Sequence, residues 1–196
     1  MDMIGGDLAL DFANTVGWHA SERPVEHFQR YEDFLAWARR SGLLSISEET
    51  ALARRGARSP RERARALSAV RALREVIYRV FAAVASGAKP ETRDLAALQA
   101  KAAGALQTGA PAWSETGVSV SWSRSQGLEW PAYPVALAAH ALLSSPALPR
   151  VRQCGNHPCG WLFLDTTRNH SRRWCTSAEC GNVTRVRRFR ARKSRS

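Results

Sequence analysis

Hydrophobic positions change their spacing several times along this chain of 196 residues. Near the start, Leu8, Leu10 and Phe12 alternate with acidic or small residues. A period of two next to glycine is typical of a half-buried strand. We therefore predict a strand in the opening segment GGDLALDFANTV.

The following segments have the spacing of helices. One helix is predicted from Tyr31 to a glycine C-terminus at Gly42. A second is predicted to start near Ser45 or Ser47, where Glu48 and its neighbour can support the first turn.

The clearest amphipathic pattern runs from Ser59 to Gly87. Ser59 and Glu62 fit an S-x-x-E capping box around Pro60, and apolar residues then recur at steps of three and four. This pattern predicts a long helix. The alanine-rich stretch from Pro90 predicts another helix, packed against the first as a helical hairpin.

Between Ala112 and Trp130 the period returns to two. We predict that VSVSW pairs with GLEW across an SRSQG turn as a β-hairpin. A helix from Pro131 to Leu143 should follow.

A boundary between two domains is predicted at residues 144–149, where SSPALPR has two prolines and no apolar period. It separates an N-terminal domain, residues 1–147, from a C-terminal module, residues 148–196. The expected class is α+β, with a mainly helical N-terminal domain that contains a small β-hairpin.

Composition indicates a globular, intracellular protein. The chain is 44% hydrophobic and 23% charged, which is far from disordered compositions. Its start lacks the positive charge and apolar region of a secretory signal. The most apolar run, Tyr133 to Leu143, is shorter than the roughly 20 residues of a membrane span. We expect a cytoplasmic protein without a membrane partner.

The net charge of +12 is concentrated at one end of the chain. Residues 150–196 contain twelve Lys or Arg against only Asp165 and Glu179, a local charge of +10, so the rest carries +2. A cationic module on a near-neutral body indicates an anionic polymer or surface as its partner.

All four cysteines lie in this module, in two pairs of equal spacing: Cys154 with Cys159, and Cys175 with Cys180. Two short-spaced pairs of thiolates can complete the tetrahedral shell of one structural Zn²⁺. The reducing environment of the cytosol disfavours disulfide bonds. Two disulfides or four unrelated thiols are the alternatives. Two histidines could also replace a ligand: His157 and His170.

The segments around the cysteines predict a treble-clef zinc finger. GWLFL alternates like a strand, DTTRNH is a turn, and SRRWC would return as the second strand. After Cys180 a short helix is predicted, with Val183, Val186 and Phe189 on the side that packs on the hairpin. So small a core should need metal to fold.

This segment resembles the CGNR zinc finger. The matching positions are Phe163, Asp165, Arg172, Arg173, Trp174, Cys175, Cys180, Gly181 and Asn182. Val183 stands where that family has an arginine, so the contact of that arginine cannot be carried over. The opening GGDLALDFANTV is similar to the start of the ABATE domain, which commonly precedes this finger.

The resemblance implies a stress-responsive bacterial transcription regulator. It would combine an ABATE-like ligand-sensing domain over residues 1–147 with a CGNR-type treble-clef finger for DNA over residues 148–196.

Arginines of the finger are the predicted nucleic-acid contacts. A helical step of about 100° groups Arg185, Arg188 and Arg192 on one side. Guanidinium groups can neutralise phosphates and read guanine in a DNA major groove, which RNA duplexes make inaccessible, so DNA is favoured. An RNA-binding or ribosome-associated adaptor is the alternative, and a solvated charged face is the simplest reading. The predicted set is Arg168, Arg172, Arg173, Asn182, Arg185, Arg187, Arg188 and Arg192.

The N-terminal domain is larger than a tether needs to be, which suggests a pocket for an unidentified small-molecule effector. The candidate lining residues are Asp11, Asn14, Trp18, Trp130 and His140, with His19 and Trp122 nearby. These side chains could instead stabilise the backbone or the core. The sequence has no nucleophile elbow, P-loop, dinucleotide fingerprint or HExxH motif, so we do not expect an enzyme.

Overall fold

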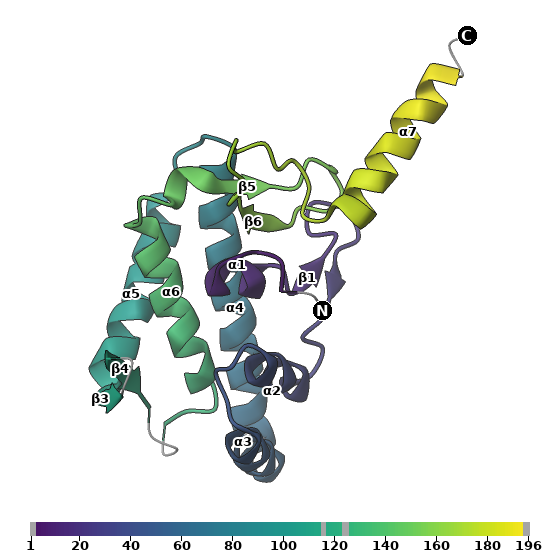
Figure 1. Cartoon of the computed structure of the whole chain (residues 1–196). Helices are drawn as coiled ribbons and strands as arrows, with labels where there is room; N and C mark the ends of the chain where they lie inside the picture. The colour runs from purple at the N-terminus through teal and green to yellow at the C-terminus, as the bar shows by residue number, and fades with distance from the viewer. Residues whose placement is uncertain (1–2, 115–116, 123–125, 194–196) are drawn as a thin grey trace.

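The computed structural model describes residues 3–114, 117–122 and 126–193, without the side chains of Ser114 and Arg188. It is mainly helical, at 57%, with small antiparallel hairpins, which confirms the predicted α+β class (Figure 1). Among the described helices, none combines the length and apolarity that a membrane span requires.

The first element is a helix, α1 (Leu8–Ala13), so the predicted strand is wrong. The Asp7 side chain caps this helix by accepting a hydrogen bond from the backbone N–H of Ala9, at 2.8 Å. Residues 9–13 are all buried, because α1 lies at the centre of the molecule against α4 (Pro60–Ala85) and α6 (Tyr133–Leu143). The alternation of apolar and polar residues therefore does not correspond to one buried and one exposed face.

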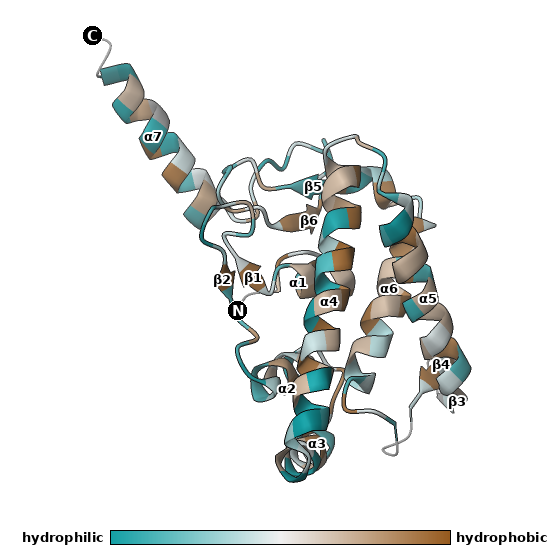
Figure 2. Ribbon diagram, turned by 180° about the vertical axis from the view of Figure 1, so that it is seen from behind, coloured by the Kyte–Doolittle hydropathy of each residue, from teal (hydrophilic) through white to brown (hydrophobic). Residues whose placement is uncertain are grey.

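The body of the molecule is a helical bundle. It consists of α4, α6 and α5 (Thr92–Thr108), with α2 (Tyr31–Arg40) and α3 (Ile46–Arg58) packed at the lower end in Figure 1. These helices confirm the five predicted helical segments of the body, and α4 and α5 form the predicted helical hairpin. Figure 2 shows α6 as mostly hydrophobic, whereas α3 is mostly hydrophilic.

The helix caps agree with the sequence at α3 but not at α4. Ser45 and Glu48 form a capping box at the start of α3. Ser59 makes no side-chain hydrogen bond at the start of α4, so that predicted capping box is wrong. Glu62 instead pairs with Arg55 of α3, because the two helices meet at this corner.

The predicted hairpin of the body exists, but it has a different partner strand. β4 (Gly117–Ser121) pairs with β3 (Ala110–Ser114), not with GLEW. Leu128 and Trp130 of GLEW are buried in the main core, and a 3₁₀ turn, η1 (Trp130–Ala132), leads into α6. GLEW therefore packs in the core and does not form a strand of the hairpin. The predicted turn lies partly outside the described residues.

The finger also pairs its strands differently from the prediction. β6 (Leu162–Leu164) pairs with β5 (Val151–Gln153), which precedes the first cysteine, and the described segment SRRWC contains no strand. SRRWC is instead held by single contacts, such as the hydrogen bond from Gly155 N to Arg173 O at 2.8 Å. The first cysteine pair therefore lies in the turn of the β5–β6 hairpin.

The last helix, α7 (Asn182–Lys193), projects from the body (Figure 1). It follows a π-helical turn, η3 (Ser177–Gly181), which is its main contact. Val183, Val186 and Phe189 are 37%, 39% and 69% exposed, so the predicted packing of this side on the hairpin is wrong. The direction in which α7 leaves the finger carries these side chains away from the strands.

Candidate metal centre and nucleic-acid interface

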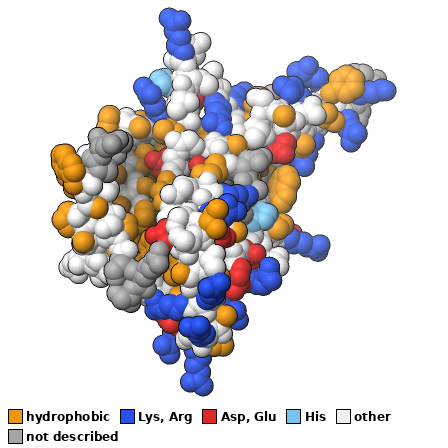
Figure 3. Space-filling view, turned by 60° about the horizontal axis from the view of Figure 1, so that its bottom comes forward, with side chains coloured by type: hydrophobic (Ala, Val, Ile, Leu, Met, Phe, Trp, Pro, Cys, Tyr) orange, Lys and Arg blue, Asp and Glu red, His pale blue; other side chains and the backbone are white. Residues whose placement is uncertain are grey.

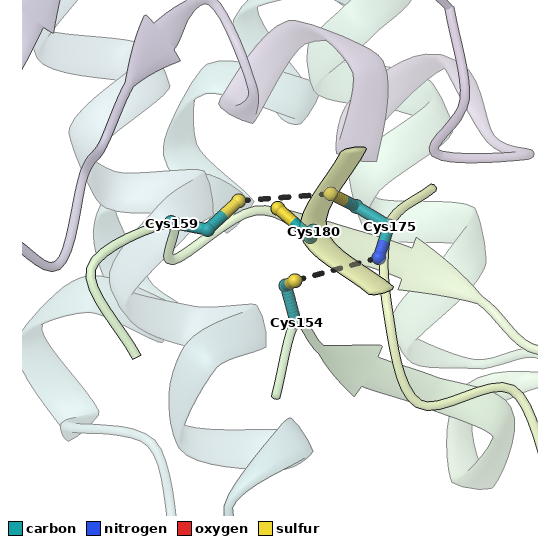
Figure 4. Close-up of side chains that lie close together, drawn as sticks. All are labelled: Cys154, Cys159, Cys175 and Cys180. Atoms are coloured by element: carbon teal, nitrogen blue, oxygen red, sulfur yellow. Dashed lines mark hydrogen bonds between the residues drawn. The ribbon is translucent and has the colours of Figure 1, made fainter. Parts of the chain in front are cut away.

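The four cysteines converge from two loops. Cys154 and Cys159 flank the turn of the β5–β6 hairpin, and Cys175 and Cys180 flank the approach to α7 (Figure 4). Their sulfurs are buried and all lie within 4.8 Å of one another, and the Cys159 and Cys175 sulfurs are 3.6 Å apart. Ligands at the Zn–S distance of about 2.3 Å on a tetrahedron would stand about 3.8 Å apart. The donor set therefore fits one tetrahedral Zn²⁺.

The four sulfurs are too close together for all of them to be thiolates without a cation. A hydrogen bond with Cys159 lowers the pKa of the Cys154 thiol, whereas the hydrogen bond to Cys154 raises the pKa of Cys175. This opposition arises because several thiolates cannot share so small a volume without a cation. A divalent ion removes the conflict and closes the coordination shell, so the site is a structural one.

Two N–H donors point at the sulfurs. Cys175 N donates to Cys154 Sγ, and Asn156 Nδ2 donates to Cys180 Sγ, each at 3.4 Å. Donors of this kind orient metal ligands and stabilise their negative charge. Asn156 also accepts a hydrogen bond from Arg187 on α7, so it connects the metal centre to that helix. Sequence reasoning missed this role, although Asn156 belongs to the Gly-Asn pair that follows Cys154.

Arg172 stabilises the finger from within. Its guanidinium lies 4.2 Å from the centre of the Phe163 ring and donates to the carbonyl oxygens of Ile4, Trp174 and Cys175. These contacts occupy the side chain that the sequence assigned to nucleic acid. Arg172 therefore has a structural role within the finger.

Asp165 holds the loop that leads to Arg172. This buried carboxylate accepts hydrogen bonds from Thr167 N and Oγ1 and from Arg172 N. Burial raises the pKa of Asp165, but these hydrogen bonds outweigh burial and hold the pKa below its ordinary value. The carboxylate thus stays charged and fixes the loop.

The finger is joined to the body by the N-terminal segment. The Asn14 side chain forms paired hydrogen bonds with the backbone of Leu162 in β6, both at 2.8 Å. Leu164 N donates to Gly5 O, and Trp161 Nε1 donates to Val16 O. Leu162 also packs in the main core. The opening segment of the chain is thus the docking element for the finger.

Most predicted nucleic-acid contacts are exposed. The space-filling view shows Lys and Arg side chains along the projecting α7, with hydrophobic side chains between them (Figure 3). Arg185 donates a hydrogen bond to Ser177 O, and Arg187 donates one to Asn156. These bonds fix the orientation of both side chains near the start of α7. The exposed members are Arg168, Arg173, Asn182, Arg185, Arg187 and Arg192. The side chain of Arg188 lies outside the described part of the structure.

The structure does not bring the predicted effector residues together. Asp11 accepts a hydrogen bond from Gly5 N, and Asn14 bridges to the finger as described above. Trp130 is buried beside α3, whereas His140 is exposed on α6. Of the five, Trp18 alone lines a cavity of about 430 Å³ at the junction of body and finger.

The two nearby aromatic residues have structural roles. The His19 ring contacts Glu75 at 3.0 Å and stacks on Tyr78. Trp122 donates to the carbonyl oxygen of Ala105 and packs against Tyr133.

Comparison with known families agrees with this geometry. A family model, ABATE, described as "Putative stress-induced transcription regulator", matches residues 6–146. The chain belongs to the ABATE family. A second model, the CGNR zinc finger, matches residues 150–193, which include all four cysteines. No curated protein matches the chain.

The recognised architecture is thus confirmed, with an ABATE domain followed by a CGNR finger that provides one structural zinc site.

Proposed function

We propose that this ABATE protein is a cytoplasmic, non-enzymatic transcription regulator that binds duplex DNA through its CGNR finger. The observation that carries the proposal is α7 itself. This helix of 12 residues contains no acidic residue and projects from the body with exposed basic side chains. These are Arg185, Arg187, Arg190, Arg192 and Lys193.

The size of α7 suits a DNA groove. At 1.5 Å per residue, a helix of this length is about 18 Å long. A B-DNA major groove is about 12 Å wide and admits one helix, whereas the major groove of duplex RNA is too narrow and deep. Phosphate contacts along the groove would position the helix, and arginine could then read guanine.

The charge of α7 also favours a polyanionic partner. Like charges three and four positions apart destabilise an isolated helix, and Arg185, Arg188 and Arg192 have this spacing. Phosphates on a nucleic acid would remove this repulsion. Binding should therefore stabilise α7 as well as hold the complex together.

Loop residues extend the proposed interface beyond α7. Arg168 and Arg173 are exposed on the segment before Cys175, and Asn182 is the first residue of α7. Val183, which stands in place of the family's arginine, offers no charge, so phosphate binding rests on the remaining arginines. Regulation by a small-molecule effector of the ABATE domain is part of the proposal.

A competition experiment distinguishes DNA from RNA. The zinc-loaded full chain is bound to a fluorescently labelled DNA duplex of mixed sequence, then challenged with unlabelled duplexes of DNA or RNA. We expect the DNA to compete at least about tenfold more effectively, because α7 cannot enter the RNA major groove. RNA that competes equally well or better would contradict the proposal and favour an RNA-binding adaptor.

A further inference from the structure

A cavity of about 430 Å³, here called the junction cavity, lies where the hairpin of β1 (Val16–Gly17) and β2 (Val25–Glu26) meets the finger. Its lining includes three of the four zinc ligands. The other side chains that matter here are Trp18, Val25, His27, Trp161, Glu179 and Val183. Small-molecule sites commonly have this volume, lie between domains and combine an apolar lining with few polar groups.

Trp18 is held at this cavity in an unfavourable backbone conformation. Its φ is 53°, in the left-handed region that bulky residues avoid, and its side chain is 45% exposed. The neighbouring hydrogen bond from His19 N to Cys159 O fixes the turn on the finger. Strained residues of this kind cluster at ligand sites. This backbone conformation therefore keeps the Trp18 indole at the surface of the cavity and not in the core.

Among the described side chains that line the junction cavity, the charged one is the carboxylate of Glu179. Glu179 forms no ion pair with any described residue, although its carboxylate accepts a hydrogen bond from Thr176 Oγ1. Burial lowers the pKa of His27, which favours the neutral ring with one nitrogen as acceptor and the other as donor. The Trp161 indole N–H is already used by Val16 O.

Positive charge is directed away from the lining. None of the described residues that line the cavity is Lys or Arg. The first two basic side chains of α7, Arg185 and Arg187, are hydrogen-bonded to Ser177 O and Asn156 Oδ1. Four thiolates around one Zn²⁺ would carry a net charge of −2. An anionic ligand would therefore meet negative charge, with no cationic side chain among the described lining residues to pair with.

We propose that the junction cavity binds a hydrophobic organic cation, with a protonated or quaternary ammonium group on an aromatic or short aliphatic body. Trp18 and Trp161 supply aromatic surface for the apolar body and cation–π attraction for the ammonium group. Glu179 supplies the opposite charge. The site stands independently of DNA binding.

Its position gives the ligand access to α7. The junction cavity reaches from Val25 in the body to Val183 in the first turn of α7. A bound cation would contact both, and this consequence for regulation rests on the proposed function.

Calorimetric and NMR titrations test the site on the zinc-loaded full chain without nucleic acid. The probes are phenyltrimethylammonium, its neutral isostere tert-butylbenzene and the anion benzenesulfonate. We expect the cation to bind at least about tenfold more tightly than either other probe. Trp18→Ala and Glu179→Gln should each weaken cation binding by about tenfold.

Matched substitutions on the far side of the body serve as controls. Trp113→Ala removes an exposed indole from β3, and Glu91→Gln removes an exposed carboxylate before α5, so both should leave cation affinity unchanged. Zinc content is measured for every variant, because Glu179 lies next to a zinc ligand. Absence of cation binding, equal binding of the isostere, or equal losses in the controls would overturn the proposal. Since no DNA is present, failure of the regulator proposal would leave these results unaffected.

Discussion

Arginine is used in opposite ways in the two parts of the molecule. In the body, Arg74 forms a two-pronged pair with Glu26, and Arg79 forms one with Asp94. Every ion pair between described residues joins two residues of the body. In the finger, Arg172 donates to carbonyl oxygens, and Arg185, Arg187 and Arg190 of α7 are exposed. The body pairs its charges internally, whereas the proposed function pairs the charge of the finger with a polyanionic partner.

The two parts also have different cores. The body buries a large apolar cluster that includes Phe12, Trp37 and Ile77. The buried cluster of the finger consists of its four cysteines and Phe163. A cluster of this composition gains little from apolar burial, so the metal ion must supply the missing free energy. This difference shows why a charged module can fold with so few apolar residues.

Removal of one zinc ligand should have the largest effect. Cys175→Ser should abolish stoichiometric zinc binding, which contributes on the order of 10 kcal/mol to the folding of such fingers. Hydrogen exchange should then become fast across residues 154–181 but stay slow in α4 and α5. Ser177→Ala is the matched control and should keep its zinc. Equal loss of protection in body and finger would mean that the two cores are one.

The second-largest effect is expected for a substitution at the junction between the body and the finger. Asn14→Ala leaves the buried N–H and C=O of Leu162 without partners, which should lower the free energy of unfolding by about 3 kcal/mol. Urea unfolding measures the change, with the exposed Asn169→Ala as control. A change no larger than that of the control would show that the finger does not depend on this contact.

An ion pair of the body should have a smaller, pH-dependent effect. The hydrogen bond from Arg79 holds the pKa of Asp94 below its ordinary value. The pair therefore stabilises the fold above the unfolded pKa of about 3.9 and loses this effect as pH falls through the folded pKa. Asp94→Asn should cost about 1 kcal/mol at neutral pH, since Arg79 is 48% exposed, and progressively less below about pH 4.

The difference between Asp94→Asn and the unsubstituted chain is read from urea unfolding at each pH. Acid release of zinc affects both chains and cancels from this difference. Glu91→Gln is the control. A difference in the free energy of unfolding that increases toward acid pH would contradict the stabilising role of the Arg79–Asp94 pair.

The smallest effect is expected on α7. Phe189→Ala should change the free energy of unfolding by less than about 0.5 kcal/mol, because this ring is exposed. Packing on the hairpin, as the sequence suggested, would instead give a loss of about 3 to 5 kcal/mol. Urea unfolding distinguishes the two values.

Local signals in the sequence predicted most helices and the metal ligands correctly. The spacing of the cysteines reflects the tetrahedral shell that they form, and the capping box at Ser45 is a contact between near neighbours. Such features depend on a few adjacent residues. They can therefore be identified without knowledge of the fold.

The errors have a common physical cause, which is long-range packing. α1 reads as a strand because its surroundings bury every side of it, and β6 pairs with β5 because the cysteine knuckle brings them together. Asn14 bonds to Leu162, 148 residues away. No local pattern contains these contacts. The amphipathic pattern of α7 likewise could not predict that this helix points away from the body.

The salt dependence of DNA binding tests the contrast between body and finger most directly. Anisotropy titrations with a labelled DNA duplex are run between about 50 and 200 mM salt, where engagement of a handful of phosphates should weaken binding tenfold to a thousandfold. A triple Arg→Gln substitution at Arg185, Arg187 and Arg190 should reduce the slope of log affinity against log salt by about 2 to 3. The same change at three exposed body positions, Arg58, Arg61 and Arg65, should leave it unchanged. A salt-insensitive affinity, or equal reductions by both triple variants, would contradict the account.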